Sequence, residues 1–267
     1  FQPNFTWIKK RNSTSAHYFF DSLRTTYSVS SNTTAAQADQ SGQGFTSLDS
    51  DGFTLSGTGG GGGGNDGTNT FASWNWKGGT TSVPSGGSIT PSTVSINTTS
   101  KQGIYKWTGN GSAGATIAHG LGGTPGLIMV KKVSVSGSWM VYHKSMGGTK
   151  TGYLESAGAF GSGTAVWNSV DQGSTYITLG NDGDVNGSGA DFIMYVFCDV
   201  PGYFYSGQYL GNGNADGPVI SSGFEPAWLM IKEADSSSGW CMYDNKRPMN
   251  AQGFYNVNQN FLQAQDT

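Results

Sequence analysis

Oxygen-bearing side chains at alternate positions form the pattern in this chain that is closest to a metal site. Asp182, Asp184 and Asn186 lie in the run Asp-Gly-Asp-Val-Asn-Gly, and oxygens two residues apart on a curled backbone can converge on one calcium ion. The acidic residue that closes a calcium loop in helix-loop-helix proteins would fall at Ile193. Because Asn, Asp and Gly also build turns without metal, we expect an Asx-rich turn and no cofactor. If Ca²⁺ binds anywhere, this is the expected place.

A glycine pattern at residues 109–114 matches the dinucleotide fingerprint GxGxxG and follows a strand-like phrase. That fingerprint needs a helix behind it to receive the pyrophosphate. Residues 116–123 have no helical pattern, and the duplicate at residues 211–216 lacks the third glycine. We therefore predict a turn here.

The histidines give no support for catalysis. His143 corresponds to Asp21 and Asp244 in other copies of an internal repeat, and His17 corresponds to tryptophan in both other copies. A catalytic group is not expected to become an aromatic residue from one copy to the next. The few acids form no paired arrangement of the kind that hydrolases use, and no GxSxG motif occurs. We predict that the protein is not an enzyme.

Aromatic side chains are the best candidates for ligand binding, since exposed rings on a β-sandwich can stack on sugars. Trp167 lies in an expected loop before Asp171 and is the best exposed candidate. Trp107 and Tyr209 are further candidates. A host-surface glycan is the corresponding ligand.

Composition predicts a chain built of strands. Only 12% of residues are charged, while 13% are aromatic and 43 are glycine. Aromatic and β-branched residues favour strands, and Gly, Asn, Asp and Ser end them in turns. We expect strands at residues 105–107, 127–133, 139–143, 153–155, 176–179 and 192–198.

One phrase occurs three times, beginning at Pro3, Pro125 and Pro226, and each copy is followed by a second matching phrase. The chain is therefore a tandem array of units of roughly a hundred residues. Trp74 and Trp76 keep the same alternate spacing as two aromatic residues of the next copy, which favours a place in the core.

The array divides into four segments. Residues 1–79 form an incomplete first repeat, 80–102 a Ser/Thr/Gly/Pro-rich linker or extended strand, 103–202 a complete second repeat and 203–267 an incomplete third repeat. These incomplete outer copies suggest a piece of a longer polypeptide. The expected fold class is all-β, with tandem β-sandwich units of jelly-roll or lectin-like type and long Gly/Ser/Asn-rich loops. The longest glycine run, residues 59–64, is expected to be a loose surface loop.

Charge and hydropathy limit the partners. With a formal net charge of −3 and a pI near 5.5, the chain lacks the basic face that phosphate binding requires, so nucleic acid is not an expected partner. No apolar run approaches the roughly 18 to 20 residues needed to cross a bilayer, so no membrane insertion is expected. Cys198 and Cys241 are expected to be free thiols, although a disulfide stays open.

The repeated phrases resemble a known family. The resemblance rests on Pro-x-Phe-x-Trp-Ile-Lys-x-Arg at residues 3–11, His-Tyr-Phe-Phe-Asp-Ser-Leu-Arg at 17–24, Ser-Asp-Gly-Phe-Thr-Leu at 50–55 and Trp-Asn-Trp-Lys at 74–77. In these phrases the chain is similar, over nearly its whole length, to a repeat domain of tail-fibre and other virion proteins of marine bacteriophages.

That resemblance implies a non-enzymatic structural or host-recognition component of a virion, partnered by copies of itself and other virion proteins. It brings no agreed binding residues. The alternative is a glycan-binding, lectin-like module or a subunit of a secreted extracellular filament or surface adhesin, which would be extracellular.

Overall fold

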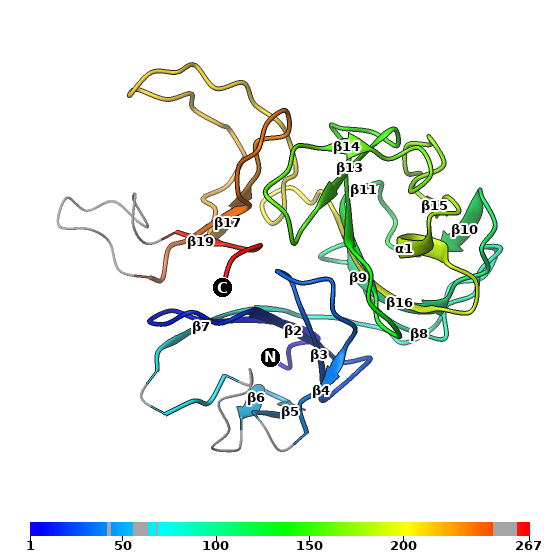
Figure 1. Ribbon diagram of the computed structural model, residues 1–267, viewed down its shortest axis with the longest axis horizontal. Helices are drawn as coiled ribbons and strands as arrows, with labels where there is room; N and C mark the ends of the chain where they lie inside the picture. The colour runs from blue at the N-terminus through cyan, green and yellow to red at the C-terminus, as the bar shows by residue number, and fades with distance from the viewer. Residues whose placement is uncertain (42–43, 56–63, 68, 248–260) are drawn as a thin grey trace.

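The computed structural model describes residues 1–41, 44–55, 64–67, 69–247 and 261–267, and their regular structure is almost wholly β (Figure 1). The all-β prediction is confirmed. One short helix, α1 (Gly183–Asn186), interrupts the strands. The described part of the chain contains no helix with the length and apolarity needed to span a bilayer. Residues 59–63 of the glycine run lie outside the described residues.

The strands follow one another along the chain in short steps. In order they are β1 (Phe5–Lys10), β2 (His17–Asp21), β3 (Tyr27–Ser30), β4 (Ala38–Asp39), β5 (Phe45–Asp49), β6 (Gly52–Leu55), β7 (Phe71–Trp76), β8 (Thr93–Asn97), β9 (Gln102–Thr108), β10 (Ala115–Ala118), β11 (Pro125–Lys132), β12 (Trp139–His143), β13 (Lys150–Tyr153), β14 (Gly161–Ser162), β15 (Tyr176–Leu179), β16 (Asp191–Cys198), β17 (Trp228–Ile231), β18 (Cys241–Asp244) and β19 (Leu262–Gln263). Five of the six expected strands coincide with β9, β11, β12, β15 and β16. The sixth, residues 153–155, begins too late, because β13 ends at Tyr153 and a turn comes after it.

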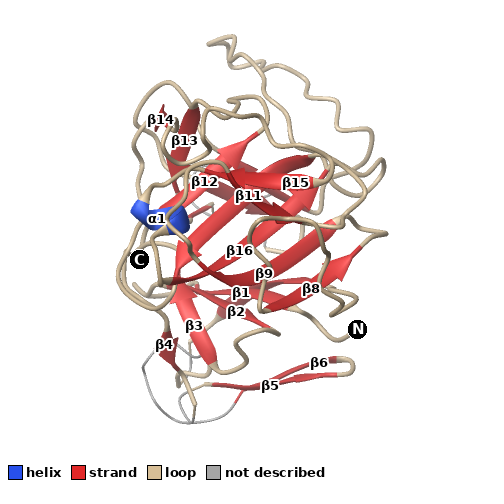
Figure 2. Ribbon diagram, turned by 90° about the vertical axis from the view of Figure 1, so that its right-hand side faces the viewer, coloured by secondary structure: helices blue, strands red, loops and turns tan. Residues whose placement is uncertain are grey.

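Three sheets contain the repeated phrases. A seven-stranded sheet has the order β14-β13-β12-β11-β16-β9-β8, a five-stranded sheet the order β4-β3-β2-β1-β7, and a three-stranded sheet the order β17-β18-β19. Two-stranded sheets β10-β15 and β5-β6 complete the fold. In Figure 2 the long strands of the seven-stranded sheet cross the molecule above β1 to β4, and the β5-β6 hairpin lies at the bottom.

The three copies of the repeat form the same hairpin in the same register. The hairpins are β1-β2, β11-β12 and β17-β18, and the matching opening pairs are Phe5 with Asp21, Leu127 with His143, and Trp228 with Asp244. An outer strand then pairs with the first strand of two of these hairpins: β7 with β1 and β16 with β11. The repeat seen in the sequence is therefore a repeat of strand pairing.

Residues 127–130 of β11 are all apolar because a core covers each face of the strand. Ile128 and Val130 point into a core that the seven-stranded sheet shares with β10 and β15. Leu127 and Met129, at the alternate positions, point into a second core. A strand buried on both faces needs a continuous apolar run, and that is what residues 127–130 provide.

The second core belongs to all three hairpins. Phe5 and Trp7 from β1, Met129 from β11, and Trp240 and Met242 from the β17-β18 hairpin region lie in one cluster of buried side chains. Figure 1 shows the three hairpins gathered around the centre of the molecule. Each copy thus completes its burial against its neighbours.

Equivalent hydrogen bonds join successive copies. The indole Nε1 of Trp139 donates to the carbonyl of Ser30 at 2.8 Å, and that of Trp240 donates to the carbonyl of Tyr153 at 3.0 Å. Ser30 and Tyr153 occupy the same register position in β3 and β13. His17 occupies the place of these two tryptophans in the first copy, and its Nδ1 accepts a hydrogen bond from Trp7 Nε1 at 2.8 Å.

The segment between the first and second repeats is partly a strand. β8 lies within residues 80–102 and pairs antiparallel with β9. Val94 and Ile96 of β8 are buried in the first core, whereas Val83 is exposed. The two cysteines are free: Cys198 is buried in β16 and Cys241 is half-buried in β18.

We expect Ile96→Ala to lower the free energy of unfolding by about 2–4 kcal/mol, because it opens a cavity in the first core. Val83→Ala is the matched control in the same Ser/Thr-rich segment and should change stability by no more than about 0.5 kcal/mol. Urea unfolding of both variants checks this. Equal losses of unfolding free energy in the two variants would mean that Ile96 does not contribute to the first core.

A second expectation concerns pH. Burial, with the positive charge of Lys9, lowers the pKa of His17 to about 3 from an ordinary value of 6.5. Between these values the unfolded chain binds a proton that the folded chain does not, so stability is complete above about pH 6.5 and falls as pH falls. The slope from this group is at most about 1.4 kcal/mol per pH unit. Unfolding of wild type and His17→Gln at pH 7, 5 and 4 should show a flatter profile for the variant; parallel profiles would contradict it.

Candidate functional site

The three expected metal ligands turn to separate partners. Asp182 caps α1, accepting a hydrogen bond from the Asp184 amide at 2.8 Å. Asp184 forms an ion pair with Lys132 at 2.8 Å and accepts from the Ser138 amide at 3.1 Å. Asn186 is buried and its side-chain amide donates to three acceptors. Across the described residues, no group of three or more His, Cys, Asp or Glu side chains is placed to hold a metal ion.

The two tryptophans expected to bind ligand are buried. The prediction that Trp167 is exposed is wrong: its exposed fraction is 0%, and its ring packs edge-on against Tyr142 at 5.6 Å. The turn that carries it, closed by a hydrogen bond from the Trp167 amide to the Gly163 carbonyl at 2.8 Å, directs the indole into the first core. Trp107 is equally buried and stacks on Phe192 at 5.2 Å. In this arrangement neither ring face is open to a sugar.

The other two candidates are exposed but lie on different loops. Asp171, between β14 and β15, accepts a hydrogen bond from the Gly148 amide at 2.8 Å and so links its loop to the one between β12 and β13. Tyr209 lies between β16 and β17 with an exposed fraction of 48%.

The loop that carries Tyr209 has several exposed large apolar and aromatic side chains. We call residues 199–227 the β16-β17 loop; it is the long gold and orange excursion at the upper left of Figure 1. Its exposed large side chains are Tyr203, Tyr205, Tyr209, Leu210, Val219 and Ile220, with Leu210 at 89% and Val219 at 96%. Lys144, which is paired with Asp199, lies over the Tyr205 ring at 5.7 Å. Exposed apolar side chains concentrated in one loop make it a candidate contact surface.

A buried polar group that the sequence reasoning missed joins the first two copies. Arg24 donates to the Asp21 carboxylate through Nε at 2.8 Å and to the Tyr195 hydroxyl at 2.9 Å. Tyr195 in turn donates to Asp21 Oδ2 at 2.7 Å. Burial raises the pKa of Tyr195 well above its usual range, so the hydroxyl keeps the proton that it donates. Asp21 and Arg24 lie at the end of β2 and just after it, whereas Tyr195 lies on β16, so the group fixes one sheet against the next.

The same turn recurs in the third copy. Asp244 accepts hydrogen bonds from the Lys246 and Arg247 amides and from Arg247 Nε at 2.6 Å. The Arg247 guanidinium lies 5.9 Å from the ring of Trp74, which holds on β7 the position that Tyr195 holds on β16. The recurrent Asp-x-x-Arg spacing was visible in the sequence and could have revealed this pair.

The middle copy has His143 in place of the aspartate and Met146 in place of the arginine. His143 Nδ1 accepts from the Ser145 amide at 3.3 Å, which keeps the turn without the ion pair.

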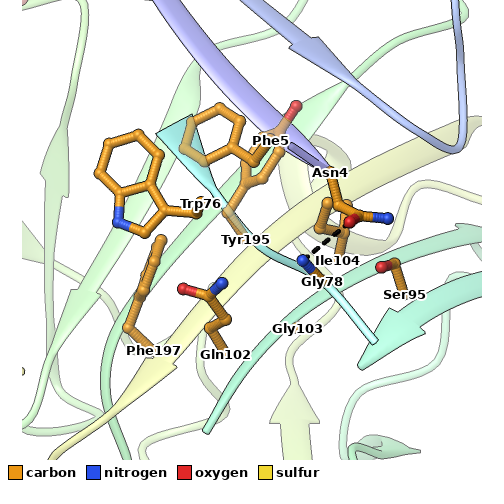
Figure 3. Close-up of a pocket in the computed structure, with 10 residues that line it drawn as sticks. All are labelled: Asn4, Phe5, Trp76, Gly78, Ser95, Gln102, Gly103, Ile104, Tyr195 and Phe197. Atoms are coloured by element: carbon orange, nitrogen blue, oxygen red, sulfur yellow. Dashed lines mark hydrogen bonds between the residues drawn. The ribbon is translucent and has the colours of Figure 1, made fainter. Parts of the chain in front are cut away.

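A small hollow lies at the junction of the first two copies (Figure 3). Phe5 stacks on Trp76 at 4.8 Å and on Tyr195 at 4.4 Å, and the Gly78 amide donates to Asn4 Oδ1 at 2.8 Å. Its volume of about 10 Å³ is close to that of a single water site and far below that of a sugar ring. This hollow is therefore a packing gap between the two copies and is too small for a sugar.

A protein-family comparison matches residues 1–267 to a family described as a domain of unknown function (DUF7483). The chain belongs to this family. No curated protein and no solved structure matches the chain. The matched residues span all three hairpins of this chain.

We expect Arg24→Met to destabilise this DUF7483 chain by about 3–5 kcal/mol, since it leaves the Asp21 carboxylate buried without its partner. Lys144→Met breaks an ion pair whose side chains are about one-third exposed and should cost no more than about 1 kcal/mol. Thermal and urea unfolding give both values. If the two substitutions cost the same, the buried group would not hold the copies together.

Proposed function

We propose that this chain is a non-enzymatic structural repeat module of a bacteriophage tail fibre or a related virion protein, assembled with copies of itself and with other virion proteins. The observation that carries the proposal is the second core, to which all three hairpins contribute side chains. A module built in this way is stable only as part of an array, which suits a shaft or fibre. The tandem repeats read from the sequence are the units of that array.

Equivalent junctions support the same interpretation. Trp139 to Ser30 and Trp240 to Tyr153 are the same hydrogen bond made twice, from one copy to the preceding one. Main-chain bonds repeat too: those of the first and second copies are Gly137 to Thr34 and Gln37 to Val133, and those of the second and third are Ser238 to Ala157 and Phe160 to Ala234. The same contacts therefore join each copy to the preceding one.

The histidines all serve structural roles in this proposal. His17 accepts from Trp7, His143 accepts from the Ser145 amide, and His119 Nδ1 accepts from the Leu121 amide at 3.2 Å. Burial lowers the pKa of all three imidazoles, which favours neutral rings with fixed hydrogen bonds.

Host-surface recognition is the second element of the proposal, and the β16-β17 loop supports it. Tyr203, Tyr205 and Tyr209 are each about half exposed there, and tyrosine rings offer both a stacking face and a hydroxyl to a sugar. The same loop would serve the alternative, a lectin-like module or a subunit of a secreted extracellular filament or adhesin. Tyr209 and Asp171 remain proposed ligand contacts; Trp107 and Trp167 could act only after leaving the core.

The place where the protein is found distinguishes the virion module from the extracellular alternative. Antibodies against residues 199–227 should label fibres in electron micrographs of purified phage particles that contain the chain. Label on cell-borne filaments, with none on particles, would favour the extracellular alternative.

We expect Tyr209→Ala to weaken attachment to bacterial surface polysaccharides by roughly threefold to tenfold, the loss of one ring-stacking contact. Tyr27→Ala is the matched control, because Tyr27 is similarly exposed, at 39%, but lies on β3. A glycan array probed with the purified chain measures both. Equal binding by wild type and Tyr209→Ala would remove the loop from the recognition surface and leave the structural role alone.

A further inference from the structure

The third hairpin has an edge that its two counterparts cover. β1 pairs with β7, and β11 pairs with β16, each by the edge that faces away from its hairpin partner. β17 pairs with β18, and no strand in the described ranges pairs with its other edge. Unpaired main-chain donors and acceptors along such an edge are a template for another strand.

Three side chains of the third copy are exposed where their counterparts in the other copies are buried. Leu229 has an exposed fraction of 42%, while Thr6 and Ile128, which hold its position in β1 and β11, are fully buried. Tyr209 corresponds to Trp107 of β9, which β16 covers in the second copy. Val219 falls in the stretch that corresponds to β10, whose partner in the second copy is β15. The β16-β17 loop therefore contains the counterparts of β9 and β10 but not those of their partner strands.

Two of the three turns that follow the hairpins contact an aromatic residue of another copy, and among the described residues the turn of the second copy lacks this contact. Asp21 and Arg24 lie under Tyr195 of the second copy, and Asp244 and Arg247 lie under Trp74 of the first. The first copy's turn thus contacts the second copy, and the third copy's turn contacts the first. By the same order, the second copy's turn, His143 to Met146, should lie under an aromatic residue of a strand paired with β17. That turn is half exposed, whereas its two counterparts are buried.

We propose that the open edge of β17 binds an antiparallel strand from outside residues 1–267, with aromatic side chains at alternate positions as in β7 and β16. Its register follows from the other copies. The donor residue opposite Trp228 takes the place of Trp76 and Phe197, and the residue opposite Met230 takes the place of Trp74 and Tyr195. The added strand extends the second core, which already contains Trp228 and Met230 at its margin.

This inference rests on the proposed function, because a repeat array is what supplies a strand of this pattern. It does not depend on host attachment. Failure of Tyr209→Ala to alter glycan binding would leave the strand site untouched, and failure of strand binding would leave the glycan result untouched.

The test uses the whole chain and a fluorescent peptide with the sequence of residues 69–78, Asn-Thr-Phe-Ala-Ser-Trp-Asn-Trp-Lys-Gly. Fluorescence anisotropy should show saturable binding. A matched peptide with serine at both tryptophan positions should bind at least roughly tenfold more weakly, because the two buried rings provide the contact. Hydrogen exchange should slow at residues 228–231 when the first peptide is bound.

Two protein variants localise the effect. Leu229→Asp should weaken peptide binding at least roughly threefold, because the new charge loses solvent when the strand docks. Val83→Asp is the control, at 37% exposure in the segment that leads to β8, and should bind as wild type does.

No saturable binding, equal binding of the two peptides, or protection confined to β1 or β11 would overturn the proposal. Dimerisation of the chain alone in sedimentation, with residues 228–231 already protected, would also overturn it and assign the edge to a second copy.

Discussion

The structure depends on the burial of aromatic rings from three repeated hairpins in one core. Phe5, Trp7, Trp139, Tyr195 and Trp240 come from all three copies, yet they belong to the same buried cluster. Rings of this size bury a large apolar area, and edge-on or offset contacts add to it. This shared core joins the three copies, while a further core lies within the second copy and its preceding segment and a smaller one within the first copy.

Polar groups then determine how the copies are oriented. The Asp21, Arg24 and Tyr195 group satisfies a buried carboxylate with a guanidinium and a hydroxyl from the next sheet. A buried ion pair adds little net stability, but it penalises any arrangement that leaves one partner alone. Its twin, Arg247 over Trp74, uses a ring face where the first junction uses a hydroxyl. The two junctions share geometry and differ in chemistry, and the middle copy keeps the turn through His143 alone.

The asymmetry among the copies links the fold to the proposed role. The first and second hairpins are covered on their outer edges by β7 and β16, while the third presents β17 and the β16-β17 loop. A strand that completes the third hairpin would also add to the core that all three hairpins share. The exposed tyrosines of the β16-β17 loop belong to the same copy.

The amino-acid sequence by itself determined the local structure. The three proline-led phrases specified the hairpins and their common register, and aromatic and β-branched runs specified β11, β12 and β16, because strand formation and turns depend on neighbouring residues. The Asp-x-x-Arg turns were also recognisable. Only the tertiary structure decided which face is covered by which copy. It buried Trp167 and Trp107 and separated Asp182, Asp184 and Asn186. Within the described residues it left one edge of β17 unpaired. Burial is a long-range property, because strands distant in sequence supply the covering side chains.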